Sequence, residues 1–232
     1  MFGLIRKTMG HRQTLVHGVA EAAAEVRQAG TQTGRIMHVM QINKRIASDV
    51  VLHNHYLRRR PPISYAYGLS DVELFGTMYG VITFGVPASH HLRMSACKSC
   101  PDSVIELNRM WLDDVMPRNT GTWFLSRVLR LLPPFIVVSY ADTAVGHVGY
   151  IYRAANFRYA GVTDMDRKTP RFDYVTDGKH SRDTTRNGTM AIADRVRRRP
   201  KHHYWTTTGD RREKRRLAVA VTWPTMQHGK WD

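Results

Sequence analysis

The segment FIVVSYADTAVGHVGYIYRAANFRYAGVT, residues 135–163, decides the fold of this chain. Its first part, residues 135–140, is a continuous apolar run rich in β-branched residues, which predicts a strand buried on both faces. Between Gly146 and Phe157 apolar residues recur at helical spacing, so a helix is expected after the strand. A buried strand followed by a helix is the building unit of α/β proteins.

The segments upstream repeat this order of strand and helix. Residues 104–112, VIELNRMWL, predict a strand, and residues 123–132 predict a helix that stops at two prolines. Within residues 72–86 we expect two more strands joined by a turn near Gly76 or Gly80. The predicted fold is therefore α/β, with a mixed central sheet flanked by helices and a basic C-terminal extension.

The two ends of the chain differ from this core. Residues 1–48 are rich in alanine and predict a helical N-terminal segment. Residues 49–163 make the predicted core. The remainder, residues 164–232, is expected to be a basic loop and tail packed on the core, with a loop at 164–195 and a closing strand at 217–223.

Composition points to a polyanionic partner. The chain of 232 residues has 35 Lys and Arg against 19 Asp and Glu, a formal net charge of +16. Such a charge gains binding free energy by releasing counterions from nucleic-acid phosphates. Double-stranded DNA is the expected partner. A merely solubilising surface and an anionic membrane surface are the alternatives.

The sequence shows neither a targeting signal nor the cysteine spacing of a disulfide framework. The N-terminus MFGLIRKTMGHRQTL lacks the apolar run of a signal peptide, and no stretch of about 18 apolar residues occurs. We expect a soluble protein of the host-cell cytoplasm, not bound to a membrane. Cys97 and Cys100 are expected to be a reduced pair; the alternative is a zinc site completed by His90 and His91.

A loop at residues 117–122 joins the predicted strand to its helix. Backbone N–H groups and the helix dipole at such a junction attract phosphate, which favours a cofactor site. The alternative is a capped helix with Asn119 or Thr120 as the cap. The candidate cofactor-binding residues are Arg118, Asn119, Gly121, Thr122 and Ser126.

Two polar clusters are candidates for catalysis. Asp142 follows a buried strand at its carboxyl end, where α/β sheets bind ligands, and can serve as general base, metal ligand or helix cap. His147 follows it as a packing or site residue. His55 and Tyr56 supply groups for acid–base work or for iron, with His53 as a rival to His55.

Basic and aromatic residues gather in two places, before the core and in the tail. Arginine and lysine contact phosphates, and aromatic rings stack on bases. The candidate nucleic-acid-binding residues are Arg58, Arg59, Arg60, Arg197, Arg198, Arg199, Lys201, Tyr204 and Trp205.

The strand–loop–helix at 104–132 and the motif Gly-His-x-Gly-x-x-Tyr at 146–152 resemble the core of a GNAT acetyltransferase. More narrowly, the Glu-Leu-Asn-Arg strand, the Ala-Asp before Gly-His, and the Arg-Pro-Lys-His-His-Tyr segment at 199–204 resemble the Mom family of phage DNA-modification proteins. The match covers about residues 72–163, with looser similarity at 53–60 and 199–224.

This resemblance implies an activity. Mom proteins convert the 6-amino group of adenine in DNA to a carbamoylmethyl derivative, which shields phage DNA from host restriction enzymes. The resemblance also implies that acetyl-CoA is the donor of the transferred group and that the protein binds iron. His55, Tyr56 and Asp142 would hold the metal, and with Tyr152 they would be catalytic. The alternatives are an acyltransferase for a protein or small molecule and a non-catalytic DNA-binding protein, each as monomer or homodimer.

Overall fold

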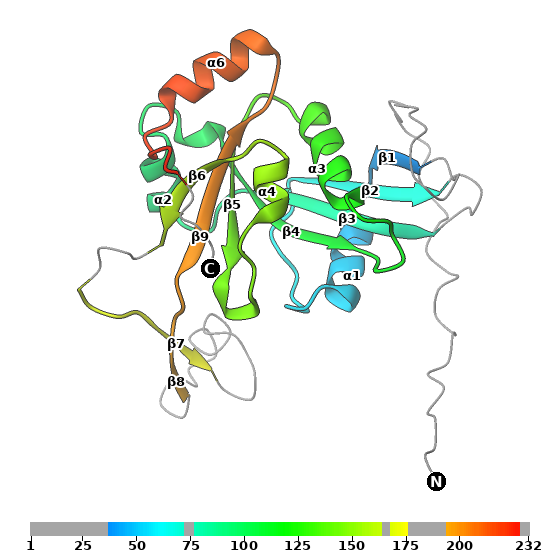
Figure 1. Cartoon of the computed structure of the whole chain (residues 1–232), viewed down its shortest axis with the longest axis horizontal. Coiled ribbons are helices and arrows are strands. Elements are labelled where there is room, and N and C mark those ends of the chain that lie inside the picture. Colours follow the sequence, from blue (N-terminus) through cyan, green and yellow to red (C-terminus); the bar gives the residue numbers. More distant parts are fainter. Residues whose placement is uncertain (1–36, 72–76, 164–167, 176–193, 228–232) are drawn as a thin grey trace.

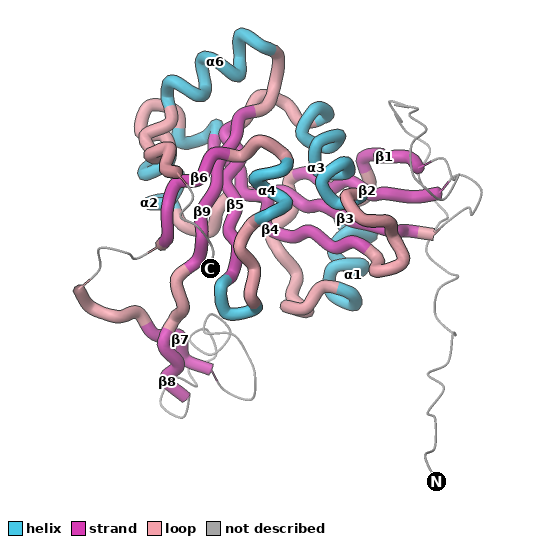
Figure 2. Tube along the Cα trace, viewed as in Figure 1, coloured by secondary structure: helices cyan, strands magenta, loops and turns pink. Residues whose placement is uncertain are grey.

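A computed structural model describes residues 37–71, 77–163, 168–175 and 194–227 (Figure 1). Within these residues a seven-stranded mixed sheet has the order β1-β2-β3-β4-β5-β9-β6, and a two-stranded ribbon, β7-β8, stands apart from it (Figure 2). The strands are β1 (Met37–Gln41), β2 (Tyr65–Asp71), β3 (Met78–Gly85), β4 (Val104–Leu112), β5 (Ile136–Asp142), β6 (Arg158–Val162), β7 (Phe172–Val175), β8 (Asp194–Arg197) and β9 (Lys201–Thr207). The helices are α1 (Lys44–Asn54), α2 (His90–Ala96), α3 (Thr120–Leu131), α4 (Tyr150–Ala154) and α6 (Arg211–Ala220), with short 3-10 turns η1 (Pro101–Ser103) and η2 (Thr143–Val145).

Strands β4 and β5 are parallel neighbours at the middle of the sheet, and they are paired along only part of their length. Pairing covers only Val104–Glu106 against Ile136–Val138; beyond these residues both strands continue without pairing to each other. The Ser139 hydroxyl still donates to the Leu107 carbonyl at 3.1 Å. The strands therefore diverge toward their carboxyl ends, where α/β proteins place their ligands.

Helices cover both faces of the sheet. Residues of α3, such as Phe124 and Val128, pack in one buried cluster with Val137 of β5 and Tyr204 of β9. On the opposite face, α1 packs on β2 and β3, and Leu217 of α6 packs with Trp205 of β9. Neighbouring residues of one strand thus enter different clusters, as expected when a strand is covered on both sides.

The α/β prediction, a mixed sheet with helices on both faces, is confirmed. The predicted strand at 104–112 is β4, the predicted helix at 123–132 is α3, and the buried strand at 135–140 is β5. The prediction of helix up to residue 48 is wrong for residues 37–41, which form β1, and its residues 1–36 lie outside the described residues. The following helix, α1, runs on to Asn54.

Strand positions at 72–86 were shifted from the prediction. One of the two strands, β2, lies before this segment, and Gly80 lies inside β3 and not in a turn; residues 72–76 lie outside the described residues. Gly80 packs close to Phe124, since a Cβ at Gly80 would lie 3.1 Å from that ring.

The C-terminal predictions need the largest corrections. The predicted closing strand at 217–223 is wrong, because residues up to Ala220 form α6. The loop predicted for 164–195 contains β7 and the start of β8 among its described residues. Strand β9, predicted as tail, lies between β5 and β6 within the central sheet.

Cys97 and Cys100 are joined in a disulfide, so the predicted reduced pair and the zinc alternative are both wrong for this structure. Their Cα atoms lie 5.4 Å apart, a spacing that a disulfide readily bridges. None of the helices in the described residues has the length and apolar composition required to span a bilayer.

Candidate active site

The divergence of β4 and β5 opens a cavity of about 530 Å³. Polar side chains reach it from both strands, from the segment after α1, from the η2–α4 connection and from the start of β9. Among them are His55, Tyr56, Asn108, Arg109, Asp142, His147, Tyr152 and Lys201. The fold thus brings together four residues predicted as catalytic, although they are spread over nearly a hundred positions of sequence.

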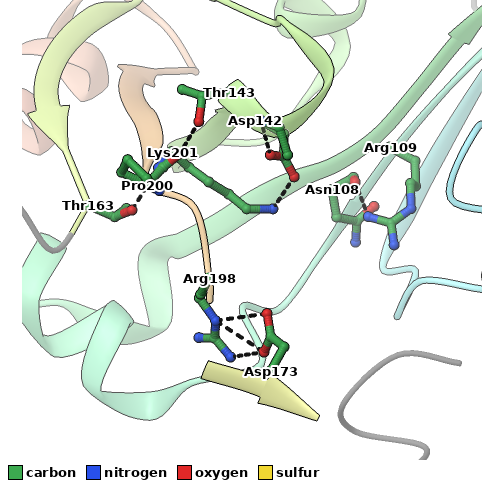
Figure 3. Close-up of polar contacts among 10 residues, drawn as sticks. Asn108, Arg109, Asp142, Thr143, Thr163, Asp173, Arg198, Pro200 and Lys201 are labelled. Atoms are coloured by element: carbon green, nitrogen blue, oxygen red, sulfur yellow. Dashed lines mark hydrogen bonds and ion pairs between the residues drawn. The ribbon is translucent and has the colours of Figure 1, made fainter. Parts of the chain in front are cut away.

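Asp142 ends β5 and holds two hydrogen bonds. One carboxylate oxygen accepts from the Ala144 N–H at 2.9 Å, which caps η2, and the other accepts from the Lys201 ammonium at 2.6 Å (Figure 3). Burial alone would raise the pKa of Asp142, but these donors outweigh burial and the pKa lies below its usual value. Asp142 is therefore an ionised group of the cavity and also a cap, but of η2 and not of the helix predicted to begin near Gly146, whose N-cap is Gly149.

His55 follows the last turn of α1 and is buried. Its Nδ1 accepts a hydrogen bond from the Leu57 N–H at 3.1 Å, so the neutral ring carries its proton on Nε2. Burial, with smaller contributions from Arg109 and His147, lowers the pKa of His55 to about 4. At neutral pH His55 is an uncharged hydrogen-bond donor.

Tyr56 stacks on His55 with ring centroids 4.4 Å apart and meets His147 edge-on at 5.6 Å. Half of its surface remains exposed, 50%, although it lines the cavity. Burial of the other half, then the Asp142 charge, raise the pKa of Tyr56. A protonated phenol ring at the cavity mouth offers a flat surface for another ring.

Tyr152 lies on α4, where it packs against Tyr204 at 5.2 Å and Phe157 at 5.4 Å between ring centroids. Burial raises the pKa of Tyr152 to about 12, so its hydroxyl stays protonated. Its position depends on Gly149, which starts α4 with a φ of 78° directly beside the Tyr204 ring.

Two polar residues of the cavity, Arg109 and Lys201, were not predicted as catalytic. Arg109 projects from β4, and its Nε is buried without a hydrogen-bond partner in the described part of the chain. Lys201, which was predicted to contact DNA, pairs with Asp142, and its contact with DNA stays a prediction. The Asn-Arg pair in the middle of a strand was the signal for Arg109, because a sheet interior rarely holds a cation without a use for it.

The predicted cofactor loop contributes little to this cavity. Of its five residues only Gly121 lines it, while Arg118 and Asn119 are exposed beside it. Asn119 occupies the N-cap position of α3, as the capped-helix alternative predicted, in a left-handed conformation, φ 70°, but its side chain makes no cap hydrogen bond. The N–H groups of the first turn are left uncapped by side chains, which suits a phosphate, and acetyl-CoA binding stays a prediction.

The donor set predicted for iron has suitable chemistry but an unsuitable arrangement. His, Tyr and carboxylate groups are ligands of iron. However, both Asp142 oxygens and the Nδ1 of His55 already accept hydrogen bonds. The described ranges hold no group of three or more His, Cys, Asp or Glu placed to bind a metal. The residues as arranged do not fit the ion, and iron stays a prediction from sequence.

The predicted DNA contacts fall into different environments. Tyr204 and Trp205 are buried in the sheet, 0% and 3% exposed, so the prediction that they stack on bases is wrong. His53, the rival of His55, is exposed, bonds the Asp49 carbonyl and does not line the cavity. Arg58 and Arg60 remain exposed near the cavity residue Tyr56, and Arg60 pairs with Asp49.

The sequence model of a protein family, the Mom protein family, matches residues 36–219 of this chain. This range includes all the residues that line the cavity in the described part of the structure. The chain belongs to the Mom protein family. The methylcarbamoylase Mom of Escherichia phage Mu is 33% identical over 131 residues, 54% of this chain and 54% of that protein. The chain therefore spans about half the length of this curated Mom relative.

Two solved structures are similar to this Mom family chain at low sequence identity. One is a ribosomal-protein-S5-alanine acetyltransferase from Vibrio fischeri, with a TM-score of 0.44 and 8% identity, covering 80% of this chain and 98% of its own. The other is a probable GNAT-family acetyltransferase from Chromobacterium violaceum, with a TM-score of 0.44 and 9% identity, covering 88% and 96%.

Proposed function

We propose that this Mom family protein modifies DNA by replacing one hydrogen of the adenine 6-amino group with a carbamoylmethyl group, and so protects phage DNA from restriction. The family, and a relative named a methylcarbamoylase, support this reaction class. The net charge of +16 supports a polyanionic substrate. The observation that carries the proposal is the single cavity that joins Asp142 and Lys201 to an exposed Tyr56 ring.

The cavity suits a base taken out of the duplex. Enzymes that act on a base extrude it into a pocket and stack it on an aromatic ring. At about 530 Å³ the cavity is within the usual range for small-ligand sites. Tyr56, half exposed at its edge, would stack on the adenine, and the cationic Arg109 beneath would contact a ring nitrogen or an anionic part of the donor.

Asp142 is the group that would act on the amine. The adenine 6-amino nitrogen is a weak nucleophile and gains positive charge as its new bond to the methylene carbon forms. In the same step the bond from that carbon to a leaving group of the donor breaks, and the leaving group keeps the electron pair. An ionised carboxylate held by Lys201 would stabilise that charge and accept the proton as the N–H bond breaks. His55, neutral with a proton on Nε2, would donate a hydrogen bond to a carbonyl oxygen of the carbamoylmethyl group.

Mass spectrometry of DNA nucleosides tests the proposal. The protein is expressed beside a reporter plasmid, and the plasmid is digested to nucleosides and weighed. We expect deoxyadenosine heavier by a carbamoylmethyl group, and a loss of roughly 100-fold or more in the Asp142→Asn variant, the usual effect of removing an acid–base group. His53→Ala is the matched control and keeps full activity, since His53 lies outside the cavity.

Other masses would contradict the proposal in distinct ways. An acetyl increment would replace carbamoylmethylation by simple acyl transfer to DNA. Unmodified adenine from folded protein would favour the acyltransferase for another substrate or the non-catalytic DNA-binding protein. Full activity of Asp142→Asn would remove Asp142 from the chemistry.

A further inference from the structure

The β7–β8 ribbon has two chemically different faces. Directly opposed residues of an antiparallel pair share a face. Phe172 therefore lies with Arg197, and Tyr174 with Arg195. The Arg195 guanidinium lies 3.7 Å from the centre of the Phe172 ring, which confirms that the two pairs form one continuous face. The opposite face carries Asp173, Val175, Asp194 and Val196.

The arginines of the first face are not neutralised. Arg195 and Arg197 are exposed, and neither forms an ion pair with an acidic side chain anywhere in the described ranges. Arg198 differs, because it pairs with Asp173 and so ties β8 to β7 at the base of the ribbon (Figure 3). One face is thus cationic and aromatic, and the carboxylates are confined to the other.

A cleft of about 720 Å³ lies at the base of the ribbon. Basic residues line it from the segment before β7 and from the end of β8 onward. Val162 and Thr163, at the end of β6, also line it. The basic lining residues are Lys168, Arg171, Arg197, Arg198 and Arg199. A cleft with this lining suits successive phosphates of a nucleic-acid backbone.

The segment 199–201 joins this cleft to the candidate active site. Arg199 and Pro200 line the cleft, and the next residue, Lys201, lines the cavity and binds Asp142. The segment is anchored to the residues that follow both neighbouring strands, because Thr143, after β5, donates to the Pro200 carbonyl at 2.6 Å and Thr163, after β6, accepts from the Lys201 N–H at 2.8 Å (Figure 3). The ribbon therefore projects from the rim of the cavity itself.

We propose that the β7–β8 ribbon is an arm that holds duplex DNA: its Phe172–Tyr174–Arg195–Arg197 face lies along the duplex, and the cleft at its base binds the phosphates flanking the target base. Two-stranded ribbons fit the grooves of DNA. The acidic face turns away from the phosphates. This inference rests on the proposed DNA-modifying function and names the surface that positions its substrate.

The test compares two pairs of exposed arginines that carry the same charge. Arg195→Ala/Arg197→Ala alters the arm. Arg215→Ala/Arg216→Ala removes two exposed charges from α6, at the other end of β9 from the ribbon (Figure 1). Affinity for a short duplex is measured by fluorescence anisotropy over a range of salt concentrations, and the modified fraction of a plasmid is measured in cells.

For the arm variant we expect a loss of roughly tenfold or more in affinity at 0.1 M salt. The slope of log affinity against log salt should fall by about 1.8, which is about 0.9 for each lost phosphate contact. The α6 variant should lose less than threefold. Equal losses in the two variants, or none in the arm variant, would overturn the arm while leaving the DNA substrate intact. No duplex binding or adenine modification by the wild-type protein would overturn the proposed function itself.

Discussion

His55 is a buried side chain whose ionisation is linked to folding. Its pKa of about 4 in the folded protein lies below the usual 6.5, so the unfolded chain binds the proton more tightly. The contribution of neutral His55 to stability is complete above pH 6.5 and declines as the pH falls toward 4. Each pH unit in this window costs up to about 1.4 kcal/mol.

The wild-type protein should therefore lose more stability between pH 7 and pH 5 than a His55→Asn variant, by about 2 kcal/mol. Urea unfolding at the two pH values measures the difference. His53→Asn, a change at an exposed position two residues away, should behave like the wild type. A His55→Asn protein with the same pH dependence as the wild type would show that the ring is not buried as described.

Site residues could be predicted where a local pattern carries the signal. Asp142 follows an apolar strand and Tyr152 sits in a glycine-marked motif, and both line the cavity. Lys201 carries no such pattern, and the Asn-Arg pair marks Arg109 as unusual in a strand without showing what surrounds it. Their place depends on the pairing of β5 with β9 and on the divergence of β4 from β5, which join residues far apart in sequence. From sequence alone, a basic residue at the start of a strand, such as Lys201, is equally consistent with a contact to DNA.

Helix α4 shows how backbone conformation limits an element that periodicity predicts. The predicted helix covers 146–157, but only Tyr150–Ala154 is helical. Gly146, Gly149 and Asn156 all adopt positive φ, which interrupts a right-handed helix on both sides. The Tyr204 hydroxyl donates to the Val148 carbonyl at 2.7 Å and fixes the turn. The apolar spacing was correct, while the glycines were the sign of a broken helix.

Two glycines in this element separate backbone strain from a steric clash. Both Gly146 (φ 73°) and Gly149 (φ 78°) are left-handed, but a Cβ at Gly146 meets nothing within 4 Å, whereas one at Gly149 strikes the Tyr204 ring. We expect Gly146→Ala to cost about 1 kcal/mol of unfolding free energy, and Gly149→Ala about 2–4 kcal/mol. Chemical denaturation of both variants measures this. Equal losses would mean that Tyr204 moves aside freely.

The C-terminal elements differ from the prediction because basic residues dominate the sequence pattern there. Helix α6 begins with a capping box, in which Asp210 accepts from the Glu213 N–H and the Glu213 carboxylate accepts from the Asp210 N–H. An Asp-x-x-Glu sequence is a recognised helix start. Strand β9 lacks alternation because Tyr204 and Trp205 are buried on opposite faces. A strand without alternation that follows a run of arginines is therefore predicted as part of a basic tail, although β9 lies within the sheet.

On the scale of the whole molecule, the ribbon is an appendage of the seven-stranded sheet. Strands β7 and β8 pair only with each other, and none of the described ribbon residues belongs to a buried cluster. At its root the Thr163 N–H donates to the Lys201 carbonyl at 2.8 Å, so the two ends of the insertion are already in contact. A short turn can therefore join Thr163 to Pro200 directly. Replacing a long loop by a short one changes the entropic cost of closing the loop only slightly.

A protein in which residues 164–199 are replaced by a three-residue turn should therefore fold. We expect a cooperative thermal transition within about 5 °C of the wild type, a shift equivalent to roughly 1 kcal/mol or less. Thr143 and Thr163 would still bind Pro200 and Lys201, so Asp142 would keep its partner. Affinity for duplex DNA should fall further than in the double-arginine variant, since the cleft is lost as well. A non-cooperative transition would instead mean that the ribbon stabilises the sheet, and that the strength of DNA binding and the stability of the fold cannot be varied separately in this chain.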